Sequence, residues 1–241
     1  MTYRVTVLML PGNMCDARMW ADLDLVIPGA RFASPVPEGA TIDAMAKHFL
    51  DAYSGMLVPI GFSMGGIVAL AMAAIAPERL VGLGLLDTNP SADAPERAEQ
   101  RLRQQQQART QGLSELVADE LKPNYLANQN RANARLRDII LTMAEDLGPE
   151  VFVAQSEALR SRPSYERTLD QLDIPVFVAC GREDRLCTPA LHAQFARRIA
   201  NAQFHVVDGA GHMLPLEQPQ VLTQLLNEWL TSVLAKEETK A

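Results

Sequence analysis

Ser63 has the sequence surroundings that point most directly to chemistry. It lies in Gly61-Phe62-Ser63-Met64-Gly65, a G-x-S-x-G string between an apolar run at residues 56–60 and an Ala-rich run at residues 64–76. A strand that turns sharply into a helix exposes such a serine, and glycines on both sides allow the close approach that the turn requires. The string with this context predicts a nucleophilic serine, whereas the string alone would also fit a Gly-rich turn with an incidental serine.

His212 is the candidate base, because a serine hydroxyl attacks efficiently only when a base accepts its proton. It follows Gly209-Ala210-Gly211, directly after the last predicted strand, which places it in a loop at the carboxyl edge of a sheet. The other histidines fall within predicted helices or a strand, where packing or surface roles are favoured: His48, His192 and His205.

Asp184 is the predicted acid that orients the imidazole of His212 and stabilises its protonated form. It comes shortly after an apolar strand pattern at residues 175–180. Glu183 is adjacent, but it would point elsewhere if Asp184 points inward. Asp87 remains an alternative acid because it ends the preceding predicted strand, although a turn or cap role also suits it.

Two backbone N–H groups are expected to hold the oxyanion that forms when Ser63 attacks. Met64, directly after the serine, supplies one. The second comes from the loop at residues 11–14, after the first predicted strand, and we assign it to Asn13. A plain strand-to-helix turn would explain the same Pro-Gly-Asn loop. The predictions for Ser63, Asp184 and His212 do not depend on the assignment of Asn13.

The elements that must position these residues alternate between strands and helices, which predicts a doubly wound α/β sheet. Strands are predicted at residues 4–10, 31–36, 56–60, 80–86, 175–180 and 202–207. Helices are predicted at residues 41–53, 64–76, 95–110, 115–121, 131–147, 149–160, 165–172 and 219–234, with a solvated tail at 236–241. No internal repeat interrupts this order.

The strand pattern disappears between residues 91 and 172. We therefore expect residues 1–90 and 173–241 to form the α/β core and residues 91–172 to form an inserted all-helical cap over the carboxyl edge of the sheet, where ligands bind in open α/β folds. The cap carries 11 of the chain's 22 basic residues. Arg97 and Arg101 lie one helical turn apart, and either a solvated helix face or a docking site for an anionic substrate or carrier protein would account for them.

Composition limits the possible partners. The chain has 241 residues and a net charge of −7, which disfavours nucleic acid and anionic membranes as partners. No apolar run reaches the length of roughly 20 residues that spans a bilayer, and the first residues show no signal-peptide pattern. The expected location is therefore the cytoplasm.

Three cysteines, Cys15, Cys180 and Cys187, fit a reducing compartment rather than a disulfide framework. Their spacing to the histidines matches no metal site, so no metal is expected. Cys15 and Cys187 are expected near the loops that carry Asn13 and Asp184, where packing explains them as well as a redox role does.

With these motifs in view, the sequence resembles the α/β-hydrolase superfamily along nearly its whole length. The matching segments are LPGN, GFSMGG, LLDTNP, CGREDRLCTP and GAGHMLPLEQP. Within it, the chain is similar to small carboxylesterases such as the pimeloyl-carrier-protein methyl ester esterases, and to the 3-oxoadipate enol-lactone hydrolases. The resemblance implies a triad of Ser63, Asp184 and His212, in the chain order of this fold, and no cofactor.

Two features depart from the pattern of the superfamily. Most relatives have His-Gly where this chain has Pro11-Gly12, so a histidine that shapes the oxyanion loop is absent. Relatives also usually carry two strands before the first one predicted here, which leads us to expect a shortened sheet of about six strands.

The function expected from these residues is hydrolysis of a small carboxylic ester, thioester or lactone through an acyl-enzyme on Ser63. A C–C hydrolase or perhydrolase would use the same triad, and a non-catalytic ligand-binding protein would share the fold.

Overall fold

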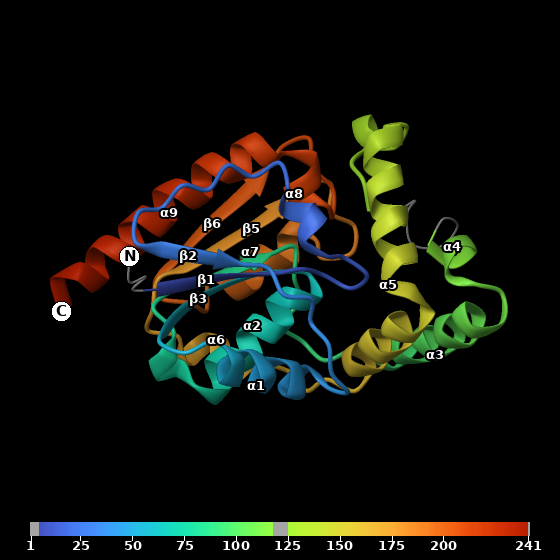
Figure 1. The fold of residues 1–241 in the computed structure, drawn as a ribbon, viewed down its shortest axis with the longest axis horizontal. Helices are drawn as coiled ribbons and strands as arrows, with labels where there is room; N and C mark the ends of the chain where they lie inside the picture. Colours follow the sequence, from blue (N-terminus) through green and yellow to red (C-terminus); the bar gives the residue numbers. More distant parts are fainter. Residues whose placement is uncertain (1–4, 118–124, 241) are drawn as a thin grey trace.

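A six-stranded parallel sheet forms the centre of the computed structural model, which describes residues 5–117 and 125–240 (Figure 1). Its order is β2-β1-β3-β4-β5-β6, and all neighbouring strands run parallel. The strands are β1 (Val5–Leu10), β2 (Ala30–Ala33), β3 (Met56–Phe62), β4 (Leu83–Leu86), β5 (Val176–Gly181) and β6 (Ala202–Val207). This confirms the predicted α/β-hydrolase architecture with about six strands.

Alternate residues of each strand enter two separate hydrophobic clusters, one on each face of the sheet. In β1, Val7 and Met9 join the cluster that contains Trp229, while Leu8 and Leu10 join the cluster that contains Phe49. Helix α9 (Pro219–Lys240) therefore covers one face. The other face is covered by α1 (Ile42–Ala52), α2 (Met64–Ile75), α6 (Glu166–Gln171) and α7 (Pro189–Ala196).

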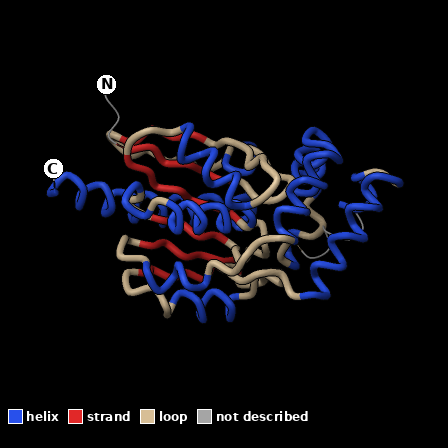
Figure 2. The backbone as a smooth tube through the Cα atoms, turned by 90° about the horizontal axis from the view of Figure 1, so that it is seen from below, coloured by secondary structure: helices blue, strands red, loops and turns tan. Residues whose placement is uncertain are grey.

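Among the described residues of 91–172, only helices and connecting segments occur. They are α3 (Pro95–Thr110), α4 (Leu113–Leu116), the short 3-10 helix η5 (Asn128–Asn130), α5 (Ala134–Arg160) and α6. Helices α3, α4 and α5 lie beyond the carboxyl ends of the strands in both views (Figures 1 and 2). Helix α5 breaks at Gly148, whose φ of 79° lies outside the helical region, and α6 packs on α2. The division into a core and a cap remains a prediction.

Two strands differ from their predicted bounds by three residues at one end. Strand β2 ends at Ala33 because its pairing with β1 ends at the Leu8–Ala33 register pair. Strand β4 begins at Leu83 because Leu80 forms only an isolated bridge with Leu57, after the 3-10 turn η2 (Pro77–Arg79). Neither change moves the strand ends that carry the candidate site.

The largest differences in helical bounds are at α9 and α4. Helix α9 continues to Lys240, so the predicted tail is helical, since no glycine or proline between 235 and 240 ends the helix. The predicted helix at 115–121 corresponds to α4 at its start, and residues 118–121 lie outside the described residues. Within residues 5–117 and 125–240, no helix combines the length and apolar character needed to cross a membrane.

The position of the site follows from the strand order. The chain passes from β1 outward to β2 and then returns across β1 to β3. The carboxyl ends of β1 and β3 therefore flank the point where the winding direction reverses, and ligands of open α/β sheets bind at such points. The loop containing Asn13 follows β1, and Ser63 follows β3.

Candidate active site

Ser63 lies in a strained turn between β3 and α2. Its backbone has φ 51° and ψ −113°, a conformation that non-glycine residues rarely adopt. A Cβ atom on Gly61 would overlap the main chain of Gly65, and one on Gly65 would overlap the main chain of Leu10. The two glycines are thus required sterically, as the G-x-S-x-G string predicts.

Ser63, His212 and Asp184 form a hydrogen-bonded row, although they come from three separate loops. The Nε2 atom of His212 lies 3.1 Å from Oγ of Ser63, and its Nδ1 atom lies 2.9 Å from Oδ2 of Asp184. His212 and Asp184 are almost fully buried, whereas Ser63 opens on a pocket. This geometry allows His212 to accept the serine proton while Asp184 holds its other nitrogen.

Asp184 is held by its own loop as well as by His212. Its Oδ1 atom accepts hydrogen bonds from the backbone N–H groups of Leu186 at 2.8 Å and Cys187 at 2.9 Å. Burial opposes ionisation of this carboxyl group, but His212 and the two amides outweigh that effect and lower the pKa of Asp184 below its usual value. The side chain is therefore an anion of fixed orientation.

Asp87, the alternative acid, lies behind Asp184 and does not contact the imidazole of His212 through any hydrogen bond in the described structure. Its Oδ1 atom accepts the N–H of Gly181 at 2.9 Å, and its Oδ2 atom has no donor beside it. Complete burial, and then the charge of Asp184, raise the pKa of Asp87 well above its usual value. Burial and the charge of Asp184 therefore both favour the neutral form of Asp87, whereas the contacts of Asp184 favour its ionised form.

Glu183, the other rival, points away from the row. Its carboxylate accepts the backbone N–H of Asn128 at 3.0 Å and lies 4.0 Å from the guanidinium of Arg185.

A buried histidine braces the end of β4 beneath the serine. His192 accepts the N–H of Thr88 at Nε2 (3.0 Å) and donates from Nδ1 to the carbonyl of Thr188 (3.1 Å). The hydroxyl of Thr88 donates in turn to the carbonyl of Ser63 at 2.7 Å. Burial lowers the pKa of His192 to about 4, so it stays neutral. These contacts agree with the packing role that the sequence favours for His192 over a catalytic one.

The predicted oxyanion residues, Asn13 and Met64, both line the pocket beside Ser63. Gln155, a fully buried residue of α5, holds the first of these two loops. Its Oε1 atom accepts the N–H of Met14 at 2.9 Å and the side-chain amide of Asn13 at 3.0 Å, and its Nε2 atom donates to the carbonyl of Pro37. The N–H of Met14 is thus engaged, which leaves Asn13 as the assigned donor. Sequence reasoning missed Gln155, because nothing local marks a contact across more than 140 positions.

Segment 125–130 of the predicted cap rests on the loop that carries His212. The carboxylate of Glu217 accepts the N–H groups of Gly211 and Ala127, each at 2.7 Å, and the side-chain amide of Asn130 at 2.8 Å. The N–H of His212 donates to the carbonyl of Tyr125 at 2.7 Å. His212, the predicted base, is therefore positioned partly by residues of segment 125–130.

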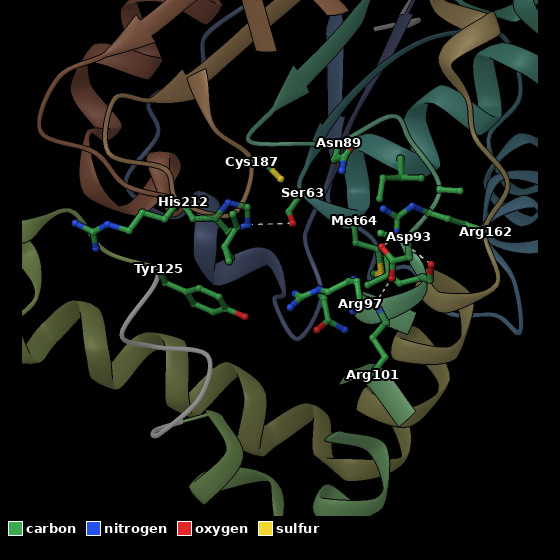
Figure 3. Close-up of a pocket in the computed structure, with 17 residues that line it drawn as sticks. Ser63, Met64, Asn89, Asp93, Arg97, Arg101, Tyr125, Arg162, Cys187 and His212 are labelled. Carbon is green, nitrogen blue, oxygen red and sulfur yellow. Dashed lines mark hydrogen bonds and ion pairs between the residues drawn. The ribbon is translucent and has the colours of Figure 1, made fainter. Parts of the chain in front are cut away.

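The pocket in front of Ser63 has a volume of about 460 Å³, within the range of roughly 300–1,000 Å³ that is usual for small-molecule sites. Figure 3 shows Ser63 and His212 on one side and several arginines on the other. Its lining also includes Asn89, Tyr125 and Cys187. The pocket is therefore apolar in part and strongly cationic in part.

Cys187 is the third member of the one close group of potential metal ligands among the described residues, with Asp184 and His212. Asp184 and His212 already bond to each other and to Ser63. Burial raises the pKa of the Cys187 thiol well above its usual value, which disfavours the thiolate that a metal needs. The donor set does not fit a resident metal. Cys15 is also buried and free, and its pKa is raised to about 12 by burial.

Comparison with known proteins places the chain in a family. Residues 7–225 match the model described as the alpha/beta hydrolase family. The chain belongs to this family. The resemblance noted from the sequence motifs is thereby confirmed.

Two relatives of known name are similar over most of this chain. A Bacillus subtilis (strain 168) candidate 2-succinyl-6-hydroxy-2,4-cyclohexadiene-1-carboxylate synthase is 29% identical over 188 residues, covering 72% of this chain and 65% of that protein. Pimeloyl-[acyl-carrier protein] methyl ester esterase of Neisseria meningitidis (serogroup A) is 24% identical over 221 residues, covering 89% of this chain and 70% of that protein. The chain thus spans about two thirds of the length of these relatives.

Solved structures extend the similarity to almost the whole alpha/beta hydrolase chain. A thermophilic esterase from Thermogutta terrifontis, with malate bound, superposes with a TM-score of 0.81 at 30% identity, covering 95% of this chain and 90% of that one. The enol-lactonase from Burkholderia xenovorans LB400 superposes with a TM-score of 0.79 at 21% identity, over 94% and 91% of the two chains. The second similarity concerns the fold alone.

Proposed function

We propose that this protein is a serine hydrolase that cleaves a small carboxylic ester, thioester or lactone. The observation that carries the proposal is the row Ser63–His212–Asp184, whose serine faces a pocket of small-molecule size. The esterases among its relatives support the same reading.

In this mechanism, Nε2 of His212 accepts the proton of Ser63 while the serine oxygen attacks the acyl carbon. The N–H groups of Met64 and Asn13 stabilise the negative charge that develops on the acyl oxygen. The leaving alcohol, thiol or ring oxygen takes the proton from His212, and an acyl-enzyme forms on Ser63. A water molecule, deprotonated by His212, then releases the acid. Asp184 stabilises the imidazolium in both halves of the reaction.

The substrate proposal extends to an anionic or carrier-linked acyl group. One relative is named for a methyl ester on an acyl-carrier protein, and a dicarboxylic acid, malate, is bound to a solved esterase of similar fold. Basic residues beside the serine make the pocket suitable for negative charge.

A fluorophosphonate probe tests the proposal, because it phosphonylates only an activated serine. Wild-type protein is expected to be labelled and Ser63→Ala is not. A panel of short-chain esters, lactones and acyl thioesters then identifies the preferred leaving group. Lack of labelling in the wild type, beside an esterase that labels, would contradict the proposal and favour a non-catalytic binding protein.

A second candidate is a non-hydrolytic or C–C cleaving reaction on a carboxylate substrate with the same three residues. The similarity to a candidate carboxylate synthase favours it. This candidate predicts serine labelling without turnover of any ester in the panel.

A further inference from the structure

The helical side of the pocket carries more positive than negative charge. Three arginines, Arg97, Arg101 and Arg162, line it together with a single carboxylate, Asp93. Asp93 contacts Arg101 at 2.5 Å and Arg162 at 2.7 Å, and the side chains of all three are at most 12% exposed. One carboxylate therefore serves two buried guanidinium groups.

Arg162 has three partners within the protein. Besides Asp93, it donates to the carbonyl of Ser91 at 3.0 Å and to the carbonyl of Leu159 at 2.9 Å. These contacts tie the end of α5 to the segment that precedes α3. Its role is structural, because it holds Asp93 and through it Arg101.

Arg97 differs from its two neighbours. Its Nη1 atom donates to the neutral side-chain amide of Gln100 at 2.7 Å, and no described carboxylate lies within ion-pair distance of it. Burial lowers the pKa values of Arg101 and Arg162, and the positive charge of Arg97 lowers them further. The same charge acts to lower the pKa of Tyr125, which burial raises. Figure 3 shows Arg97 and Tyr125 reaching into the same space in front of Ser63.

Arg97 is half-buried at the pocket and has no described carboxylate within ion-pair distance, and a carboxylate is the group that a guanidinium pairs with best, through two parallel hydrogen bonds. We propose that Arg97, with Arg101 beside it, is a receptor for a free carboxylate on the substrate. The substrate class is then an ester that also carries a carboxylate, such as a half-ester of a short dicarboxylic acid. The part of this inference that concerns cleavage of the ester rests on the proposed function. The binding of the carboxylate does not depend on it.

Two pairs of substrates test the receptor by matching charge against size. Monomethyl glutarate against methyl pentanoate places the carboxylate on the acyl side, and 3-acetoxypropanoate against propyl acetate places it on the alcohol side. For Arg97→Gln, the ratio of kcat/KM for the anionic over the neutral ester should fall about 10- to 100-fold in at least one pair, mainly through KM. The pair in which it falls identifies the side of the carboxylate.

Arg103→Gln is the matched control on the same helix. The Arg103 side chain is 70% exposed and lies beside Glu99, away from the catalytic pocket. For Arg103→Gln, the ratio of kcat/KM for the anionic over the neutral ester should equal that of the wild type. A ratio unchanged by Arg97→Gln in both pairs, or changed equally by Arg103→Gln, would overturn the receptor.

A binding measurement separates this inference from the proposed function. If the wild type cleaves none of the four esters, calorimetry with free glutarate still tests the receptor, while fluorophosphonate labelling tests the proposed function separately. Binding to the wild type that weakens at least tenfold in Arg97→Gln supports it, and equal or absent binding overturns it. Should Arg97→Gln fail to fold, Arg97→Lys replaces it, with a smaller expected loss because an ammonium group cannot pair in the same two-point manner.

Discussion

The pocket has two walls that differ in how their charges are balanced. The sheet wall, formed by Asn13, Ser63, Met64 and His212, follows the carboxyl ends of the strands, and each charged group behind it has a defined partner. The helical wall, formed by Asp93, Arg97, Arg101 and Arg162, has three guanidinium groups for one carboxylate. Under the functions proposed above, bond cleavage and substrate selection would reside on separate parts of the chain.

The largest expected effect comes from removing the nucleophile on the sheet wall. Ser63→Ala should lower kcat for ester hydrolysis by at least about 10³-fold, because the acyl-enzyme no longer forms. Glutarate affinity, measured by calorimetry, should remain that of the wild type, since the helical wall is intact. Loss of both properties in a folded variant would show that the walls are not separable.

The two buried aspartates behind His212 should respond very differently to amide substitution. Asp184→Asn should reduce kcat/KM by about 10³- to 10⁴-fold, because the amide no longer stabilises the imidazolium. Asp87→Asn should retain activity within about tenfold, because Asp87 has no hydrogen bond to His212 in the described structure and its raised pKa favours a neutral group that the amide resembles. Steady-state kinetics on one neutral ester decides the comparison. Equal losses, or a greater loss in Asp87→Asn, would move the acid role to Asp87.

His192 makes the brace under the sheet wall sensitive to acid. Its pKa is lowered to about 4 in the folded protein, from an unfolded value of about 6.5, so the stability it contributes is present above pH 6.5 and is lost as the pH falls toward 4. The loss amounts to about 3 kcal/mol. Denaturant unfolding of the wild type and of His192→Gln at several pH values measures it.

In that experiment the free energy of unfolding of His192→Gln should decline less steeply between pH 6.5 and 4, because the titrating group is gone. Parallel curves for the two proteins would refute the assignment. The other acidic groups titrate equally in both, so the difference between the curves isolates the histidine.

A smaller effect is expected where the two walls meet. Gln155→Ala removes the acceptor that holds the loop of Asn13 and Met14, and kcat should fall about tenfold as the oxyanion donor loses its position. KM for the neutral ester should change little. Gln104→Ala, a buried glutamine on α3, is the control for general loosening of the helices. If it reduced kcat as much, Gln155 would have no specific role.

The sheet wall could be predicted from sequence because local chemistry determines it. A strand that must turn into a helix without a clash demands Gly61 and Gly65, and the loops after β5 and β6 carry Asp184 and His212 wherever the strands pair in parallel. The six strands and the family followed from the same patterns. Because β3, β4, β5 and β6 are consecutive neighbours in a parallel sheet, the loops that follow them lie at the same edge.

The helical wall could not be predicted in the same way, because its contacts join residues far apart in the chain. Asp93 pairs with Arg162, 69 positions away, as well as with Arg101, whereas Arg97 on the same helix has no described carboxylate within ion-pair distance. Helical spacing alone treats the two alike. Gln155 was missed for the same reason, since an amide on a helix has no pattern that reveals its distant partners.

The contacts of Glu217 limit how the predicted cap, residues 91–172, could be exchanged for that of a relative. Its carboxylate joins Ala127 and Asn130 to Gly211, next to His212. A chimera whose backbone took another path at 125–130 would leave this carboxylate short of donors and the backbone N–H of His212 without the carbonyl of Tyr125. In such a chimera, residues 125–130 and residues 209–217 should therefore come from the same parent protein.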